Sequence, residues 1–362
     1  MRRILLSAIL AAFELLTPLF AEAQLPAPRE DAAKLTKPTI CYNSYDNYEI
    51  RLMDWDGQND RLWLGDGKIR FSSGMQWAPN GKRAAVMTFD SEDWSYTPHV
   101  IDLKTGRSKN LMDLGIPKSK EGYRRLSWSP DGRWLTLVDT WYVTNIIVHG
   151  YLYKVNVDNG NFIRLTKQPW MNPDLSAWSP DGKRIAFGAL KEPKVEGFPS
   201  NSDIYAMNAD GSDMVNLTDH PAWEEYPAWS PDGKKIAFRA YRDNEDLEVE
   251  RPVGRVELYI MDPDGSNVER LTHNAGWEGG VSWSSDSQWL VYRAGPVNRD
   301  DPTLEGVYRM HIPTKKTVLI KQARVRGPMW VLAGKSRFLS VDPAGKKKSA
   351  MGQNKRGGRQ PE

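Results

Sequence analysis

The amino-acid sequence predicts an all-β protein, a six-bladed β-propeller with four-stranded blades. Two repeated motifs support this prediction: a tryptophan-centred motif recurs along the chain, and a second motif with an Asx-Gly turn interleaves with it. The repeat region lacks the sustained 3.6-residue apolar period of an amphipathic helix. Short strands grouped in fours at such a period are typical of propellers.

The first motif is centred on six tryptophans, which we call the anchors. Its clearest copies read W-S-P-D-G-K-R-I-A-F from Trp178 and W-S-P-D-G-K-K-I-A-F from Trp229. Successive anchors are 51, 50, 51, 54 and 47 residues apart, and this regularity predicts six blades. The anchors are Trp77, Trp128, Trp178, Trp229, Trp283 and Trp330, of which the last two begin worn copies.

Each unit divides into four predicted strands, named A to D. Strand A ends at the anchor, and Ser-Pro-Asp-Gly forms the A–B turn, because proline pre-sets one backbone angle and glycine accepts the left-handed one. Strand B is the continuously apolar I-A-F run, as expected for a strand buried on both faces. Strand C is the I-Y-x-M run, as at residues 204–207. An Asx-Gly hairpin follows, and strand D ends at a Leu-Thr pair.

The two ends of the chain are predicted to close the ring. The first strand, at residues 39–42, has no strand A before it. Two candidate strands remain near the C-terminus, at residues 326–330 and 338–341. We expect C-terminal strands to complete the first blade, and the sequence leaves open whether one or both join it.

The N-terminal segment has the pattern of a secretory signal peptide. Arg2 and Arg3 precede a mostly apolar stretch, and Ala21-Glu22-Ala23 resembles a cleavage site, so we predict cleavage after Ala23. No other stretch is long and apolar enough to span a bilayer. The predicted organisation is a signal peptide (1–23), a linker (24–37), the propeller (38–342) and a tail (343–362). The predicted location is the periplasm or the outside of the cell.

Charge and cysteine content exclude several classes of protein. The 362-residue chain has 49 Lys and Arg, 46 Asp and Glu, and a formal net charge of +3. The tail from Gly345 holds six basic residues and one acidic residue, so we predict a disordered basic tail on a slightly acidic ring. An exported, slightly acidic ring argues against nucleic-acid binding. The single cysteine excludes a disulfide framework.

The repeat W-S-P-D-G-K-x-I-A-F with I-Y-x-M-x-x-D-G and Leu-Thr resembles the propeller repeats of the TolB family. The resemblance covers roughly residues 38–342 and implies a six-bladed propeller and an exported protein. About fifteen residues separate Gln24 from the first strand, so the α/β domain that precedes the propeller in TolB is missing from the predicted organisation. Similar repeats resemble the propellers of prolyl-oligopeptidase-type peptidases and of oligogalacturonate lyase.

Candidate binding residues lie in the long, variable B–C and D–A connections on one face of the ring. Loops of this kind on a rigid scaffold often carry function. The sequence allows two interpretations: a site with an acidic and a basic side, or tryptophans that pack between blades beside solvated charges. The candidates are Trp94, Trp141, Trp170, Trp223, Trp277, Asp174, Glu225, Glu278, Arg124 and Arg326, with Glu224 and Arg125 beside two of them.

Motifs that would indicate catalysis are missing from the sequence. It has no G-x-S-x-G, no H-E-x-x-H and no phosphate-binding glycine loop, and we predict no cofactor. His220 and His273 each follow a Leu-Thr pair and are weak candidates for a metal site. We therefore predict a monomeric, non-catalytic scaffold that binds a protein or a small ligand on the loop face. The alternative is an enzyme with a metal or acid–base site at the channel mouth, similar to oligogalacturonate lyase.

Overall fold

The computed structural model describes most of the chain between the two predicted terminal segments. The described residues are 25, 28, 38–44, 49–65, 70–71, 75–89, 96–119, 122–142, 148–167, 169–171, 175–190, 202–242, 255–273, 276–296, 305–323 and 325–330. The predicted signal peptide and basic tail lie outside these residues. No helix of the described part is long and apolar enough to cross a membrane.

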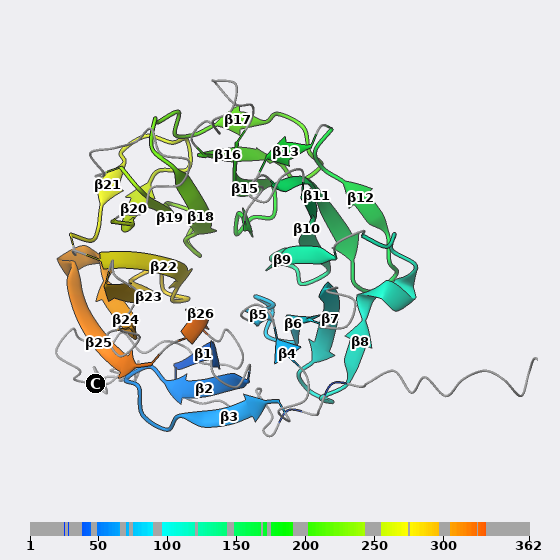
Figure 1. Ribbon diagram of the computed structural model, residues 1–362, viewed down its shortest axis with the longest axis horizontal. Coiled ribbons are helices and arrows are strands. Elements are labelled where there is room, and N and C mark those ends of the chain that lie inside the picture. Colours follow the sequence, from blue (N-terminus) through cyan, green and yellow to red (C-terminus); the bar gives the residue numbers. More distant parts are fainter. Residues whose placement is uncertain are drawn as a thin grey trace, which may run out of the picture.

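The molecule is a six-bladed β-propeller, as the sequence predicts. Six antiparallel sheets are arranged around a central axis, and each has a path of four strands from the inside of the ring to the outside (Figure 1). Blades 4, 5 and 6 follow the simple order A, B, C, D of the predicted repeat.

The first three blades run as follows, from the inner strand outward. Blade 1 contains β26 (Val325–Trp330), β1 (Thr39–Ser44), β2 (Ile50–Asp54) and β3 (Arg61–Leu64). Blade 2 contains β4 (Arg70–Phe71) and β5 (Gln76–Trp77), which both pair with β6 (Arg83–Phe89), then β7 (Tyr96–Asp102) and β8 (Ser108–Asn110). Blade 3 contains β9 (Tyr123–Trp128), β10 (Trp134–Tyr142), β11 (Val148–Asn156) and β12 (Phe162–Arg164), with β13 (Trp170–Met171) also paired to β11.

The other three blades have the same inside-to-outside order. Blade 4 contains β14 (Ser176–Trp178), β15 (Arg184–Ala189), β16 (Asp203–Asn208) and β17 (Val215–Asn216). Blade 5 contains β18 (Glu224–Trp229), β19 (Ile236–Ala240), β20 (Glu257–Met261) and β21 (Glu269–Arg270). Blade 6 contains β22 (Gly276–Trp283), β23 (Trp289–Pro296), β24 (Gly306–His311) and β25 (Lys316–Gln322). Two short 3₁₀ turns, η2 (Leu111–Leu114) and η4 (Ile312–Thr314), follow β8 and β24.

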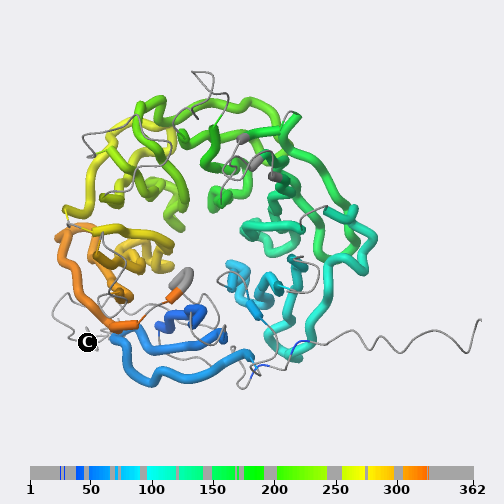
Figure 2. Tube along the Cα trace, viewed as in Figure 1, coloured from blue at the N-terminus to red at the C-terminus, as the bar shows by residue number. Residues whose placement is uncertain are grey.

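The ring closes by pairing of the two ends of the propeller. β26 pairs antiparallel with β1, so that Ile40 lies opposite Trp330 and Cys41 opposite Met329. Figure 2 shows the first strand, in blue, beside the last described strand, in orange. The strand at 326–330 is therefore a closing strand, whereas the candidate at 338–341 lies outside the described residues.

The Ser-Pro-Asp-Gly turns are held by the same hydrogen bonds in several blades. In blade 4 the Ser179 hydroxyl donates to Asp181 Oδ1 over 2.6 Å and accepts the Arg184 N–H over 2.9 Å, while Asp181 Oδ1 accepts the Lys183 N–H over 3.0 Å. Equivalent bonds occur around Ser129, Ser230 and Ser284. The worn copy keeps them because Ser287 adopts the left-handed φ of 58° that glycine supplies elsewhere.

The core lies between neighbouring blades. In one cluster Ala186 and Ile204 of blade 4 pack against Phe238 and Tyr259 of blade 5, and five other clusters each join two neighbouring blades in the same way. Both faces of the middle strands are therefore buried, which explains the continuously apolar I-A-F runs. We call the end of the ring that carries the Ser-Pro-Asp-Gly turns the turn face, and the opposite end the loop face.

Candidate binding cavity and its collar

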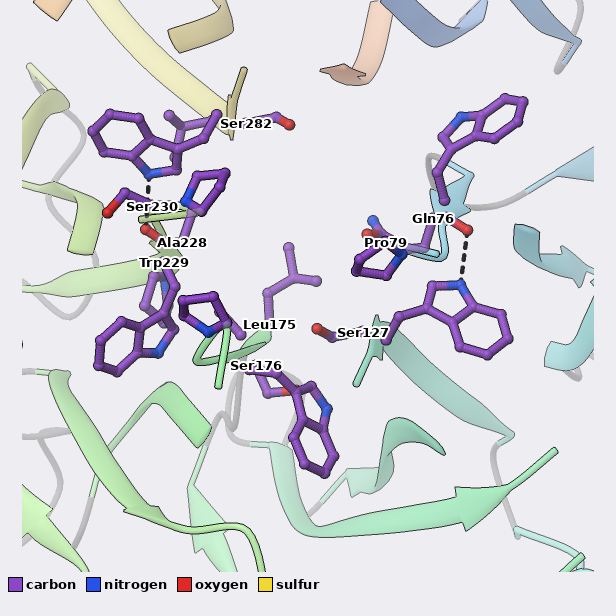
Figure 3. A pocket seen from close by; sticks show the side chains of 18 of the residues that line it. Gln76, Pro79, Ser127, Leu175, Ser176, Ala228, Trp229, Ser230 and Ser282 are labelled. Atoms are coloured by element: carbon purple, nitrogen blue, oxygen red, sulfur yellow. Dashed lines mark hydrogen bonds between the residues drawn. The ribbon is translucent and has the colours of Figure 1, made fainter. Parts of the chain in front are cut away.

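The inner strands of blades 2 to 6 surround a central cavity of about 680 Å³ (Figure 3). Its described wall contains no charged side chain. The wall consists of anchor tryptophans, prolines of the A–B turns, small inner-strand residues and a few larger ones. Members of the first two groups are Trp77, Trp128, Trp178, Trp229, Trp283, Pro79, Pro130, Pro180 and Pro231.

The anchors differ in burial and in hydrogen bonding. Trp128 and Trp283 are buried, and their indole N–H groups donate to the backbone oxygens of Gln76 and Ala228 in the preceding blades, over 2.9 and 3.0 Å (Figure 3). Trp178 and Trp229 are only half-buried. The anchors of blades 2 to 6 thus both pack in the clusters between blades and form the cavity wall, a second role that the sequence analysis did not predict.

Four described inner strands shift their pairing register: β26 on β1, between Cys41 and Asn43, and the three strands described next. The pairing register shifts in β9–β10 before Val138, in β18–β19 between Glu225 and Ala228, and in β22–β23 between Gly279 and Ser282. The bulged residues Arg125, Tyr226 and Gly280 have φ values of 61°, 60° and 64°. Left-handed backbone is uncommon for arginine and tyrosine, and bulges redirect side chains.

The side chains of two of these bulged residues, Arg125 and Tyr226, contact each other, and Arg239 also contacts Tyr226. The guanidinium of Arg125 lies 5.3 Å from the ring centre of Tyr226, and the guanidinium of Arg239 lies 3.9 Å from it. We call Arg125, Tyr226 and Arg239 the collar. Arg125 belongs to blade 3 and Tyr226 to blade 5. The collar therefore joins two blades that are separated in the ring by blade 4.

Arg239 is fixed by a buried ion pair. Its Nε and Nη2 donate to Glu225 Oε1 over 3.0 and 2.5 Å, and both side chains are almost fully buried. On the side of blade 6, a Cβ atom at Gly279 would lie 2.7 Å from Arg239 Nη1. The absence of a side chain at Gly279 therefore leaves room for the guanidinium.

Glu224 and Glu278, two further predicted acidic residues, are also buried. Glu278 is fully buried, and Glu224 is fully buried and accepts a hydrogen bond from Arg242 Nε over 2.6 Å. Burial raises the pKa of Glu224 to about 7, against the opposing effect of Arg242. This carboxyl group is bound by Arg242 and is not part of the cavity wall, so it is not placed to contact a ligand there.

The predicted loop tryptophans fall into two groups. Trp170, Trp223 and Trp277 are buried, Trp170 within β13 and Trp277 within β22, and this placement favours the packing interpretation. Trp141 is half-buried at the end of β10, with its ring centre 5.4 Å from that of Tyr151. Trp94 lies outside the described residues.

The remaining candidates are dispersed. Arg124 lies 4.7 Å from the ring centre of Tyr96. Asp174 lies outside the described residues, as does the side chain of Arg326 in β26. The Nδ1 atom of His220 accepts the Ala222 N–H over 3.0 Å, while His273 is exposed. No group of three or more His, Cys, Asp or Glu that could hold a metal ion occurs in the described part of the chain.

Tyr226 and Arg239 were not predicted as site residues. A signal was present, because W-E-E-Y at 223–226 aligns with W-E-G-G at 277–280 and places Tyr226 opposite Gly280. Glycine at the equivalent position indicates a backbone that needs positive φ. The collar contact itself depends on the spatial relation of blades 3 and 5, which the alignment does not contain.

The fold is a six-bladed propeller whose central cavity has no charged side chain in its described wall, and solved structures include similar propellers. Superposition with TolB from Acinetobacter baumannii gives a TM-score of 0.59 at 21% identity, covering 82% of this chain and 67% of that one. Superposition with a putative TolB from Agrobacterium tumefaciens gives a TM-score of 0.56 at 20% identity. It covers 80% of this chain and 90% of that one. At these sequence identities the similarity shows a shared fold and nothing more.

Relatives found by sequence match parts of the chain. No family model matches the chain. An uncharacterized protein of Agrobacterium fabrum is 29% identical over 218 residues, covering 59% of this chain and 67% of that protein. A dipeptidyl-peptidase 5 of Porphyromonas endodontalis is 26% identical over 153 residues. That match covers 40% of this chain and only 20% of the peptidase.

Proposed function

We propose that the protein is an exported, non-catalytic propeller of the periplasm or cell envelope that binds a protein segment or a small ligand. The observation that carries this proposal is the central cavity of about 680 Å³, whose described wall is mainly tryptophan, proline and small residues and has no charged side chain. Binding sites for small groups are mostly apolar concave surfaces with a few polar groups. Ser127, Ser176 and Ser282 supply such groups here.

The chemistry of the wall favours an apolar or aromatic group of the ligand. Indole rings offer large apolar surface at low cost in conformational entropy, and proline rings add rigid apolar surface. A charged group placed in the cavity would lose its hydration without meeting a counter-charge in the described wall. We therefore expect the bound group to be leucine, phenylalanine, proline or a chemical analogue of these.

An enzymatic function is the alternative. The raised pKa of Glu224 is the property that an acid–base catalyst would need, and a peptidase is among the relatives. Glu224 is, however, fully buried and engaged by Arg242, and it is not part of the cavity wall. These contacts favour a structural role for this carboxyl group.

Site-specific photo-cross-linking in the native envelope tests the binding proposal. A photoreactive residue at Ser282, in the cavity wall, is compared with one at Lys316, which is exposed on the outer strand β25. We expect Ser282 to capture one reproducible partner that Lys316 does not capture. Equal capture at both positions would contradict a cavity site. Stoichiometric metal that is lost in the His220→Ala, His273→Ala variant would instead support the enzyme.

Export is tested separately by the N-terminal sequence of the protein recovered from the producing cell. A mature chain that begins at Gln24, found in the periplasmic or extracellular fraction, is the expected result. An intact Met1 in the cytoplasmic fraction would contradict export, and it would leave the cavity proposal to be judged by the cross-links.

A further inference from the structure

The residue that directly precedes the anchor tryptophan differs among blades 2 to 6, and in all five it is part of the cavity wall. In blade order this position holds Gln76, Ser127, Ala177, Ala228 and Ser282. Because these residues occupy the same place in the repeat, they show how the chemistry of the wall changes around the ring.

The hydrogen-bonding members of this set are grouped around one part of the ring. Gln76, Ser127 and Ser282 belong to blades 2, 3 and 6, and only blade 1 lies between blades 6 and 2. The two alanines belong to the neighbouring blades 4 and 5. Figure 3 shows Gln76 and Ser127 on the right and Ala228 on the left. We call the wall of blades 6, 2 and 3 the polar side and that of blades 4 and 5 the apolar side.

Two side chains of the polar side are free to bind a ligand. The backbone oxygen of Gln76 accepts the indole N–H of Trp128, and that of Ser127 accepts the Thr136 hydroxyl over 3.2 Å. The side chains of Gln76 and Ser127 make no hydrogen bond within the described part of the chain. Both residues are half-buried, and their polar atoms are not among the buried unpaired ones, so a ligand in the cavity can reach them.

The apolar side offers few free polar groups. Leu175 and Pro227 join its two alanines in the wall. Its serines, Ser176 and Ser230, are buried and hydrogen-bonded to other side chains. The ring of Tyr226 is in contact with the two guanidinium groups of the collar. A polar group of a ligand placed against the alanine, leucine and proline side chains would lose its hydration without gaining a hydrogen bond.

We propose that the cavity binds an uncharged ligand whose amide group is held by Gln76 and Ser127 and whose apolar group packs against the apolar side. A carboxamide carries a donor and an acceptor, as the Gln76 side chain does, so each can satisfy the other. The Ser127 hydroxyl can donate or accept in addition. This inference rests on the proposed function and names the class of ligand for the same cavity.

The two-sided wall distinguishes an amide from a sugar. Glutamine and serine would also suit the hydroxyl groups of a sugar, but a sugar carries hydroxyl groups around its whole ring. Those that faced blades 4 and 5 would be left without a partner, which costs free energy. A ligand with one amide end and one apolar end fits both sides of the wall.

Titration of the purified full-length protein with N-acetyl-L-leucinamide tests the inference, with dissociation constants measured by ligand-observed NMR. N-acetyl-L-leucine has a carboxylate in place of the terminal amide. It should bind at least about tenfold more weakly, because the described wall has no counter-charge. Gln76→Leu should weaken binding of the amide about three- to tenfold through loss of hydrogen bonds.

Two further variants separate the cavity from the rest of the surface. Gln58→Leu makes the same substitution at an exposed position outside the described cavity wall, and it should bind the amide like the parent. Ser127→Ala should weaken binding about two- to fivefold, and it keeps the test open if Gln76→Leu does not fold. Far-UV circular dichroism identical to that of the parent verifies that a variant is folded.

Three results would overturn the inference: equal affinity of the folded cavity variants and the parent for the amide, N-acetyl-L-leucine binding as tightly as the amide, or methyl β-D-glucoside binding more tightly than the amide. No binding of the amide to the parent would overturn it too. The cross-link at Ser282 judges the proposed function independently. Capture of a partner there would leave the proposed function standing in each case, and failed capture together with no binding would remove both.

Discussion

The two ends of the inner strands differ in how alike they are from blade to blade. At the turn face, Ser129, Ser179, Ser230 and Ser284 make the same hydrogen bonds to an aspartate two residues later and to the backbone five residues later. At the loop face, the bulged position is arginine in blade 3, tyrosine in blade 5 and glycine in blade 6.

The contrast separates the positions that build the ring from those that make one blade unlike another. The repeated bonds give blades 3 to 6 the same geometry at the entry to strand B. The bulged positions share a backbone conformation but not a side chain, so they can differ among blades without altering the fold.

The largest expected effect comes from the anchors at the repeated end. Trp283→Ala removes a buried indole and its hydrogen bond to Ala228 O, and we expect a loss of about 3–5 kcal/mol in the free energy of unfolding. Trp178→Ala should cost roughly half as much, because the half-buried Trp178 already faces the cavity. Urea denaturation measures both, and equal losses would remove the distinction between the two anchors.

The buried ion pair of the collar should give the next largest effect. Arg239→Met leaves Glu225 buried without its main counter-charge and should destabilise the protein by about 3 kcal/mol. Adding Glu225→Leu to Arg239→Met should restore most of this loss, because no charge then remains buried. If the double variant were less stable than Arg239→Met alone, packing and not charge pairing would account for the stability of the collar.

The repeated end of the strands was predictable because its chemistry is local. Ser, Pro, Asp and Gly within one turn specify its conformation, and the Leu-Thr pair likewise acts nearby: Thr218 Oγ1 accepts the N–H of Ile204 over 3.0 Å on the paired strand. The period of the anchors then determined the number of blades and the closing of the ring.

The loop-face end was only partly predictable because its contacts join residues of different blades. Arg124 and Glu225 were candidates, but the left-handed φ of Tyr226 has no local sequence signal of its own. The pairing of Glu225 with Arg239 requires the register of β18 on β19, including its bulge. The role of Pro180 and Pro231 in the cavity wall requires the positions of their turns in the closed ring.

Burial of Glu224 predicts a pH effect at the irregular end. The folded protein keeps the proton up to a pKa of about 7, whereas the unfolded chain releases it near 4.5. The unfolded state therefore binds fewer protons between these values, and stability falls as pH rises through this range. Relative to Glu224→Gln, the parent should lose on the order of 2 kcal/mol between about pH 5 and pH 8 in guanidinium denaturation. If the difference in unfolding free energy between the parent and Glu224→Gln stayed constant with pH, Arg242 would be keeping Glu224 ionised over the whole range.

The smallest expected effect tests whether the turn-face end is as uniform as its hydrogen bonds. Ser179→Ala removes a buried hydroxyl that donates to Asp181 and accepts the Arg184 N–H, and should cost about 1–1.5 kcal/mol. Ser129→Ala, Ser230→Ala and Ser284→Ala make the same change in other blades and should agree with it within about 0.5 kcal/mol. Ser285→Ala, at an exposed position of the worn turn, serves as the control and should be neutral. If the losses of unfolding free energy in the four variants differed by as much as the expected loss itself, the same hydrogen bonds would contribute unequally. The blades would then differ at the turn-face end too.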